Sequence, residues 1–503
     1  MDAKKRMVVN TIAQYLRSVI NTLLSLLSTR IIMQALGVYD FGIYAVIGGV
    51  VALIGFINNA LSITTQRYIS YYFNKKDKAM LIFKNSMFIH LVLSVLLLFL
   101  LVAFTEPVIN GILEIDASRL DAAKAVYIIV SVILTIGILT SPFRAMLIAH
   151  ENIVYMSIID VCDGVLKLLF AIMLLYVPFD KLIMYGFIML FMQSFNLIAF
   201  AGYSLYNYQE CSIKIHKNDL NRNDIKKLTG FMGWTTYSMG VIVGRNQGIA
   251  ILINNFFGVI ANTAYGIANQ VYASVAFIAT SVLNAMNPQI MKAEGEGKRE
   301  KMLHLATLES KYSTALLLLF FIPVIFEMEA LLNLWLPEVP ENAVMFCQMI
   351  LIAFICDQLT YGLNTANQAT GHIHNYIILI YTPKLILIAV ILVCLLIGGT
   401  AFHVMLLYLL FEILSAILRI PYLHYTCGLN VVEYIKNVFV RLSPLVIFEG
   451  LVSWEIIRLV DIPFRFVLTG CVAVLAGIVA SWTMVLDAKE RESFRKLIHD
   501  RVR

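Results

Sequence analysis

The stretch VNTIAQYLRSVINTLLSLLSTRIIMQALG, Val8 to Gly37, decides the fold class of this chain. It is apolar and longer than the ~20 residues with which a helix crosses a bilayer. It nevertheless contains Arg17 and Arg30, and a charged side chain at the centre of a bilayer costs at least ~2.5 kcal/mol. A span that keeps such residues predicts a polytopic membrane protein with arginines inside a helix bundle.

The composition of the whole chain supports a membrane protein. Of its 503 residues, 60% are hydrophobic and 14% are charged, with a mean hydropathy of +0.81, whereas soluble domains carry about 25% charged residues. The basic residues lie at helix ends and inside spans rather than in one patch, so nucleic acid is not an expected partner. The seven cysteines form no C-x-x-C pair, so neither a disulfide framework nor a metal site or cofactor is expected.

Fourteen segments are long and apolar enough to cross the membrane, which predicts an all-α polytopic fold of about fourteen transmembrane helices. They lie near residues 9–35, 41–72, 79–104, 122–148, 152–176, 182–207, 228–255, 260–290, 304–335, 343–368, 373–397, 401–424, 437–459 and 463–486.

The distribution of Lys and Arg among the loops predicts the orientation. If the N-terminus is cytoplasmic, nearly all loop cations lie inside, and the outer loops clearly hold only Arg119 and Lys181. The positive-inside rule therefore places both termini in the cytoplasm. The outer loops are also short, the longest running from about 105 to 121, which disfavours an enzyme with an external active site.

The two halves of the chain repeat each other. At an offset of 221 residues Gly37 meets Gly258 and Tyr44 meets Tyr265. Six spans repeated in one orientation predict two six-helix lobes with a pseudo-two-fold relation, plus two extra C-terminal helices. The predicted parts are an N-lobe at 1–207, a cytoplasmic linker at 208–227, a C-lobe at 228–427, spans 13 and 14 at 436–487, and a basic cytoplasmic tail at 488–503.

Polar residues form stripes on the spans. Asn10, Gln14, Arg17 and Asn21 share one face of the first helix at ~100° per residue, whereas Arg30 lies on another face near the outer end and is explained by snorkelling. Hydrogen bonds between helices are the alternative explanation for the Asn and Thr residues. The predicted lining of a polar cavity is Asn10, Gln14, Asn21, Asn59, Asn269, Thr280, Asn284, Asn287, Asn364 and Gln368.

Acidic residues also occur inside the spans. Asp163 and Lys167 are four residues apart, a spacing that allows an ion pair within one helix. Two interpretations stay open for the intramembrane acids: charge-neutral structural pairs, or a proton or sodium site coupled to transport. The candidate coupling residues are Asp160, Asp163, Asp357 and Glu412.

Basic residues inside the spans outnumber these acids and predict an anionic ligand. The guanidinium group of arginine is permanently charged and pairs with phosphate oxygens through two hydrogen bonds. The ligand is expected to combine an anionic group with polar groups and a lipid tail. The predicted cationic cavity contains Arg17, Arg67, Arg144, Lys167, Arg245 and Arg419.

Three stretches resemble bacterial polysaccharide flippases, which export O-antigen or capsule repeat units. They are QALGVYDFGIYAVIGGVVALIGFINNALSITTQRYIS at 34–70, SPFRAMLIAHENIVYMSIID at 141–160 and NQATGHIHNY at 367–376, and the most specific part is LGVYDFGIY at 36–44. This family is part of the multidrug/oligosaccharidyl-lipid/polysaccharide exporter superfamily. The resemblance implies two six-helix bundles, a central cavity and alternating access, with no enzymatic activity.

The resemblance also implies a location and partners. The location is the bacterial cytoplasmic membrane, and the substrate is an undecaprenyl-pyrophosphate-linked oligosaccharide carried from the cytoplasmic to the outer leaflet. Membrane lipids and other polysaccharide assembly proteins are the implied partners, and proton or sodium antiport is the implied coupling. Two alternatives remain: a cation-coupled multidrug exporter, although the first span lacks the acid such proteins use, and a membrane glycan polymerase or processing enzyme.

Overall fold

The computed structural model describes residues 3–52, 55–111, 115–216, 219–336, 339–488 and 490–492. Every regular element in these ranges is a helix, so the all-α prediction is confirmed. Most of the predicted basic tail, namely Lys489 and residues 493–503, lies outside the described residues.

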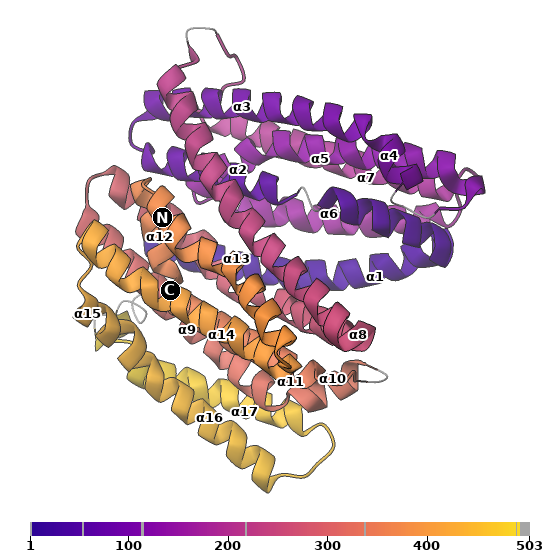
Figure 1. The fold of residues 1–503 in the computed structure, drawn as a ribbon. Helices are drawn as coiled ribbons and strands as arrows, with labels where there is room; N and C mark the ends of the chain where they lie inside the picture. Colours follow the sequence, from indigo (N-terminus) through magenta and orange to yellow (C-terminus); the bar gives the residue numbers. More distant parts are fainter. Residues whose placement is uncertain are drawn as a thin grey trace, which may run out of the picture. The chain divides into compact units, whose positions relative to one another are not determined.

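In the first half of the chain, the described residues form seven α-helices and a short 3-10 turn, Ala117–Arg119. The α-helices, labelled in Figure 1, are α1 (Ala3–Ala52), α2 (Phe56–Tyr71), α3 (Lys76–Ala103), α4 (Thr105–Gly111), α5 (Leu120–Ala149), α6 (Ile153–Leu174) and α7 (Lys181–Asn207).

The second half begins with the long helix α8 (Arg222–Gly295). It continues with α9 (Arg299–Phe326), α10 (Met328–Trp335), α11 (Ala343–Gln358), α12 (Tyr361–Thr370), α13 (His374–Leu396), α14 (Ala401–Cys427), α15 (Val431–Ile435), α16 (Arg441–Leu459) and α17 (Arg465–Ala480). Two π-helical segments, Lys436–Val440 and Ser481–Val485, adjoin α16 and α17.

Helices occupy each of the fourteen predicted spans, although several spans are bent or broken. Among the described residues, 8 helices are long and apolar enough to cross a membrane, or up to 10 if each bent pair is one span. The bent pairs are Ile260–Ala276 with Ile278–Gly295 and Ala343–Gln358 with Tyr361–Thr370, each bent by 46°. Helices such as α6 fall outside this number because charged residues interrupt their apolar sequence.

The chain divides into two compact units, which we describe separately. The N-terminal unit comprises Arg6–Met239, and in it α5 packs against α2, α3 and α7 (Figure 1). The C-terminal unit comprises Gly240–Arg503 with Met1–Lys5, and in it α9 packs against α11, α12, α16 and α17. The boundary between the units falls within α8.

Two glycines with the same unusual backbone mark the repeat. Gly37 in α1 has φ 76° and ψ 169°, and Gly258 in α8 has φ 84° and ψ −179°. This region of φ/ψ space is essentially restricted to glycine. The last helices of the two predicted lobes, α7 and α14, begin 220 residues apart and are both 27 residues long. The break in α1 and the break in α8 thus recur at the offset of the predicted repeat.

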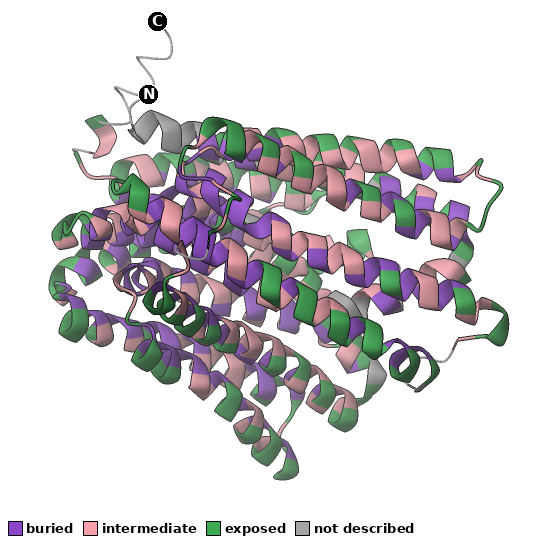
Figure 2. Ribbon diagram, turned by 90° about the horizontal axis from the view of Figure 1, so that it is seen from above, coloured by how far each residue is buried: buried purple, intermediate pink, exposed green. Residues whose placement is uncertain are grey.

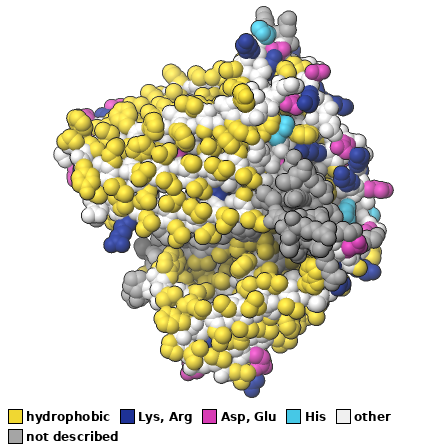
Figure 3. All heavy atoms as spheres, turned by 180° about the vertical axis from the view of Figure 1, so that it is seen from behind, with side chains coloured by type: hydrophobic (Ala, Val, Ile, Leu, Met, Phe, Trp, Pro, Cys, Tyr) yellow, Lys and Arg dark blue, Asp and Glu magenta, His cyan; other side chains and the backbone are white. Residues whose placement is uncertain are grey.

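The helix surfaces are those of a multi-pass membrane protein. Many helices carry buried residues on one face and exposed residues on the other (Figure 2). The exposed faces are apolar, with Phe99 at 70% and Ile198 at 71% exposure. On the face shown in Figure 3, hydrophobic side chains cover broad areas and most visible charged side chains gather along one edge. Such exposed apolar surface is stable when lipid is the solvent.

Candidate functional site

The N-terminal unit contains a polar cluster around Asp160 of α6. Nη1 of Arg17, from α1, donates a hydrogen bond of 2.6 Å to Oδ2 of Asp160, and its Nη2 donates to Oε1 of Gln14 at 3.0 Å. Arg144, from α5, donates to the two oxygens of Asp160 at 3.3 and 3.2 Å and lies over the ring of Phe200 at 4.8 Å. One carboxylate is therefore shared by two guanidinium groups from different helices.

The ion pair that the spacing of Asp163 and Lys167 allows is not formed. Oδ1 of Asp163 instead accepts a hydrogen bond of 2.8 Å from Nδ2 of Asn196 on α7. No ion pair within 4 Å joins Lys167 to an acid among the described residues. The reason is that the carboxylate turns towards the neighbouring helix α7, which offers a neutral donor, rather than along its own helix.

Arg67 lies apart from this cluster. Its side chain is buried among aromatic rings, 4.2 Å from the ring centre of Tyr68, 5.1 Å from that of Tyr71 and 5.2 Å from that of Phe231. Stacking of a cation on ring faces is favourable by about 0.5–2 kcal/mol. The structure therefore places Arg67 in an aromatic environment between α2 and α8, and it does not bring Arg67 together with Arg17.

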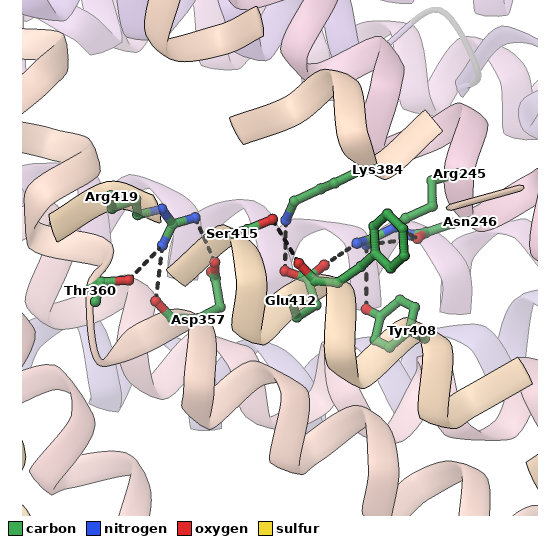
Figure 4. Close-up of polar contacts among 10 residues, drawn as sticks. Arg245, Asn246, Asp357, Thr360, Lys384, Tyr408, Glu412, Ser415 and Arg419 are labelled. Carbon is green, nitrogen blue, oxygen red and sulfur yellow. Dashed lines mark hydrogen bonds and ion pairs between the residues drawn. The ribbon is translucent and has the colours of Figure 1, made fainter. Parts of the chain in front are cut away.

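The C-terminal unit contains a second cluster, centred on Glu412 of α14 (Figure 4). Nη1 of Arg245, from α8, donates to Oε1 of Glu412, and Nζ of Lys384, from α13, donates to Oε2 at 2.7 Å. Arg245 also donates to the hydroxyl of Tyr408 at 3.3 Å and to Oδ1 of Asn246 at 3.0 Å. Again one carboxylate is held by two cations from different helices.

Arg419 of α14 forms hydrogen bonds to the residues at the break between α11 and α12. Its Nη2 donates to Oδ1 of Asp357 at 2.6 Å, and its Nη1 donates to the carbonyl oxygen of Asp357 at 3.0 Å and to Oγ1 of Thr360 at 3.3 Å. A broken helix leaves backbone carbonyls without their usual partners, and inside a membrane protein another group must satisfy them. Arg419 therefore binds the backbone at the helix break, through the carbonyl oxygen of Asp357, as well as the carboxylate of Asp357.

Sequence reasoning missed Lys384. The signal was present, because Lys384 interrupts an apolar run and lies 221 residues after Asp163, the offset of the repeat. An acid in one half thus corresponds to a base in the other. Asn196 and Tyr408 were missed for a different reason: their roles depend on contacts between helices that spacing along one helix does not reveal. Asn246, which binds its neighbour Arg245 in the same helix, was also missed.

The predicted polar lining is divided among different environments. Asn10 is buried and donates to the carbonyl oxygen of Glu151 at 2.7 Å. Oδ1 of Asn287 accepts from Thr365 at 3.0 Å, and Asn269 donates to the carbonyl of Tyr265 in its own helix. The other members are Gln14 and Asn364, both buried, Asn21, Asn284 and Gln368, which are partly buried, and Asn59 and Thr280, which are exposed.

The two clusters have the same charge balance. We count with the first cluster the other two charged residues of α6, Asp163 and Lys167, and with the second the pair of Arg419 and Asp357. Each cluster then contains three cations and two acids: Arg17, Arg144 and Lys167 with Asp160 and Asp163, and Arg245, Lys384 and Arg419 with Asp357 and Glu412. Each cluster thus has a formal charge of 3 − 2, or +1, when all groups are ionised. Among the described residues, no group of three or more His, Cys, Asp or Glu side chains is arranged to hold a metal ion.

Comparison with known proteins identifies the fold. No family model matches the chain, and no curated protein matches it. A MATE protein in the straight conformation has 14% identity and a TM-score of 0.71, covering 87% of this chain and 98% of that one. An outward-facing multidrug resistance MATE family transporter of the MOP superfamily has 12% identity and a TM-score of 0.68, covering 87% and 97%.

A third structure with this fold is described by the polarity of its binding pocket. It is a MOP superfamily transporter from Pyrococcus furiosus, described as having a binding pocket of reverse polarity that suggests a different function. It has 12% identity and a TM-score of 0.64, covering 85% of this chain and 96% of that one. The chain therefore has the fold of the MATE transporters.

Proposed function

We propose that this protein is a flippase for a lipid-linked oligosaccharide. Its substrate is a glycan on undecaprenyl pyrophosphate, which it carries by alternating access from the cytoplasmic to the outer leaflet of a bacterial cytoplasmic membrane. The product serves the synthesis of O-antigen, capsule or exopolysaccharide. The observation that carries the proposal is the excess of cations over acids in the polar cluster of each unit.

The chemistry of the clusters favours an anionic ligand. Asp160 is already bound by Arg17 and Arg144, and Glu412 by Arg245 and Lys384. Neither acid is left to bind a cationic drug, whereas each cluster retains one positive charge in excess. Charge-assisted hydrogen bonds to phosphate oxygens contribute about 1.5–3 kcal/mol each. A pyrophosphate with several such bonds is thus the ligand class that these groups suit best.

A multidrug exporter is the second candidate, because one structural neighbour is a multidrug resistance transporter. It would require a free acid within the membrane for the drug or for the coupling cation. Asp163 is the member of the two clusters that suits this role, because its described partner is the neutral amide of Asn196. Exchange of Asp163 for Asn tests this alternative: loss of drug efflux with unchanged glycan transport would favour it.

The remaining sequence-based expectations belong to the same proposal. They include cytoplasmic termini, the lobe boundaries at 207 and 228, and proton or sodium coupling through the acids of the clusters. The partners expected in the cell are the lipid-linked glycan, membrane lipids and other polysaccharide assembly proteins.

A flipping assay with the purified chain tests the proposal. Proteoliposomes containing a labelled prenyl-pyrophosphate oligosaccharide are treated with a membrane-impermeant enzyme that modifies only exposed glycan. We expect Arg245→Ala and Arg17→Ala to slow transfer at least tenfold, because each removes a phosphate contact worth about 1.5–3 kcal/mol. Arg245→Lys is the matched control, since it keeps the charge but loses the planar fork, and it should retain part of the activity.

Two results would contradict the proposal. The first is transfer at the normal rate by both alanine variants when size-exclusion profiles show that they are folded. The second is a covalent change in the substrate recovered from the vesicles, because a flippase changes only the leaflet, whereas a polymerase or processing enzyme changes the mass of the glycan.

A further inference from the structure

Glu449 of α16 is a buried acid outside the two polar clusters. Its side chain has 0% exposure, and neither of its carboxyl oxygens has a hydrogen-bond partner among the described residues. A charged carboxylate without a partner in an apolar interior costs several kcal/mol, so such a group is expected to bind a proton and become neutral.

The packing around Glu449 leaves room for its carboxyl group. Helices α9, α16 and α17 pack against one another at this point. A Cβ atom at Gly477 of α17 would collide with Oε1 of Glu449 and would lie 2.6 Å from Cδ2 of Leu319 on α9. Glycine at position 477 therefore allows a carboxyl group to lie between three helices. Close packing of three helices does not by itself require a carboxyl group between them.

Two hydroxyl groups near Glu449 are also without partners among the described residues. Ser453 is one turn further along α16, and Ser481 is one turn beyond Gly477 in the segment that follows α17. The Oγ atoms of both serines are buried and lack hydrogen-bond partners in the described part of the chain. A turn corresponds to ~5.4 Å along a helix, so these hydroxyls lie on either side of the Glu449 level.

Ion pairs occur at both ends of this three-helix group. At one end, Glu327 accepts hydrogen bonds from Thr469 at 2.7 Å and from Arg465 at 3.0 Å. At the other end, Nζ of Lys311 donates to both oxygens of Glu490 at 2.7 Å. Leu319, which marks the Glu449 level on α9, is eight residues from both Lys311 and Glu327, or ~12 Å along the helix in each direction.

None of the charged groups on these helices neutralises Glu449. Lys311 and Arg465 are paired with Glu490 and Glu327, and Arg441 of α16 lies 3.9 Å from Asp487. The other ionisable groups on the packed helices are Arg299, Glu300, Lys301, His304, Glu309 and Tyr312 on α9, Glu455 and Arg458 on α16, and Cys471 on α17. No hydrogen bond joins any of them to Glu449 in the described residues.

We infer that Glu449 is a proton-binding site at mid-depth of the α9–α16–α17 group. Its carboxyl group is neutral at physiological pH and exchanges its proton with water through the hydroxyl groups and ion pairs above and below it. Chains of Asp, Glu and His side chains form proton relays in pumps and transporters, and here a buried serine hydroxyl lies one turn away on either side of the acid. The site is separate from the two cationic clusters and does not depend on the identity of the transported molecule.

Infrared difference spectroscopy on the full chain in lipid tests this inference. Glu309 is likewise buried with no hydrogen-bond partner on its carboxyl oxygens in the described residues, so the spectrum of Glu449→Gln is subtracted from that of the unmodified protein. The difference should contain the C=O stretch of a protonated carboxylic acid. The band should shift to lower frequency after incubation in D2O, because the proton exchanges. The matched control is Glu327→Gln, which removes an ion-paired carboxylate and should leave the band in place. A spectrum unchanged by Glu449→Gln, or a band that D2O does not shift, would overturn the inference.

A labelling experiment on the unmodified chain avoids any dependence on how the variants fold. Dicyclohexylcarbodiimide reacts with protonated carboxylic acids in apolar surroundings: the carboxyl oxygen bonds to the central carbon, the proton moves to a nitrogen, and the acyl group then shifts to nitrogen without a leaving group. Peptide mass spectrometry should find this adduct on Glu449, in larger amounts at lower pH, and not on Glu327. Absence of the adduct from Glu449 would refute the assignment.

Discussion

Removal of the Glu412 carboxylate should strongly destabilise the C-terminal unit. The side chains of Arg245, Lys384 and Glu412 are 6%, 7% and 7% exposed, so the three charges are held almost without water. Their sum is +1, and Glu412→Gln raises it to +2. Breaking a buried ion pair on one side costs about 3–5 kcal/mol because an uncompensated charge remains. At about 1.4 kcal/mol per factor of ten, the ratio of folded to unfolded protein should fall at least a hundredfold.

A second substitution separates charge from packing. In the double variant Lys384→Met/Glu412→Gln the charge returns to +1, with Arg245 still bonded to Tyr408 and Asn246. Thermal unfolding in one detergent, followed by size exclusion, should place the double variant between the single variant and the unmodified protein. Glu433→Gln, at an exposed position, serves as the control and should change stability by less than about 0.5 kcal/mol. A single variant as stable as the unmodified protein, or a double variant less stable than the single one, would refute the electrostatic reasoning.

Four other substitutions test the fold and one of its ion pairs. Gly37→Ala and Gly258→Ala should each cost about 1–3 kcal/mol, since both glycines have positive φ in a region closed to other residues; unequal losses in thermal stability would argue against equivalent roles. Gly362→Ala should destabilise by about 1–3 kcal/mol through overpacking, because its Cβ would collide with a carbonyl oxygen of α9, and normal stability would show that the two helices can separate. Partial burial raises the pKa of Asp180, but the hydrogen bonds and charge of Arg119, together with hydrogen bonds from the backbone N–H groups of Ile183 and Leu182, lower it by more and hold the pKa below its ordinary value of 3.8. The ion pair therefore stabilises the protein at neutral pH, and this stabilisation is lost as the pH falls through the lowered pKa of Asp180. Below about pH 4, the melting temperature of Arg119→Ala should therefore fall less on acidification than that of the unmodified protein. Equal losses would contradict the pairing.

The fold was largely predictable because lipid requires a simple pattern. Each span must be apolar over about 20 residues, so hydropathy alone placed a helix at all fourteen positions. The repeat was found from a few identities, and Gly37 and Gly258 among them proved to share a backbone that other residues avoid. The breaks within spans, such as the one between α11 and α12, were not predicted, since no proline stands at that break to mark the end of a helix.

The candidate site was predictable only in part. Spacing along one helix correctly grouped Gln14 with Arg17, which are hydrogen-bonded. It failed for Asp163, whose partner lies on another helix. It also gave no indication that Glu412 binds Lys384, because the two residues are 28 positions apart and on different helices. Pairing between helices depends on their rotation about their own axes, which a hydrophobic period determines only to within the width of its apolar face.

The positive φ angles of Gly37 and Gly258 have a consequence at the level of the gene. Every amino acid that a single-base missense change of a glycine codon can produce carries a Cβ atom, and a Cβ atom is what this backbone conformation disfavours. At neither position can a single-base change give a residue that adopts this backbone conformation without strain. In a saturation library selected for membrane expression, the two codons should therefore lose nearly all their nonsynonymous variants together, although they lie 221 codons apart.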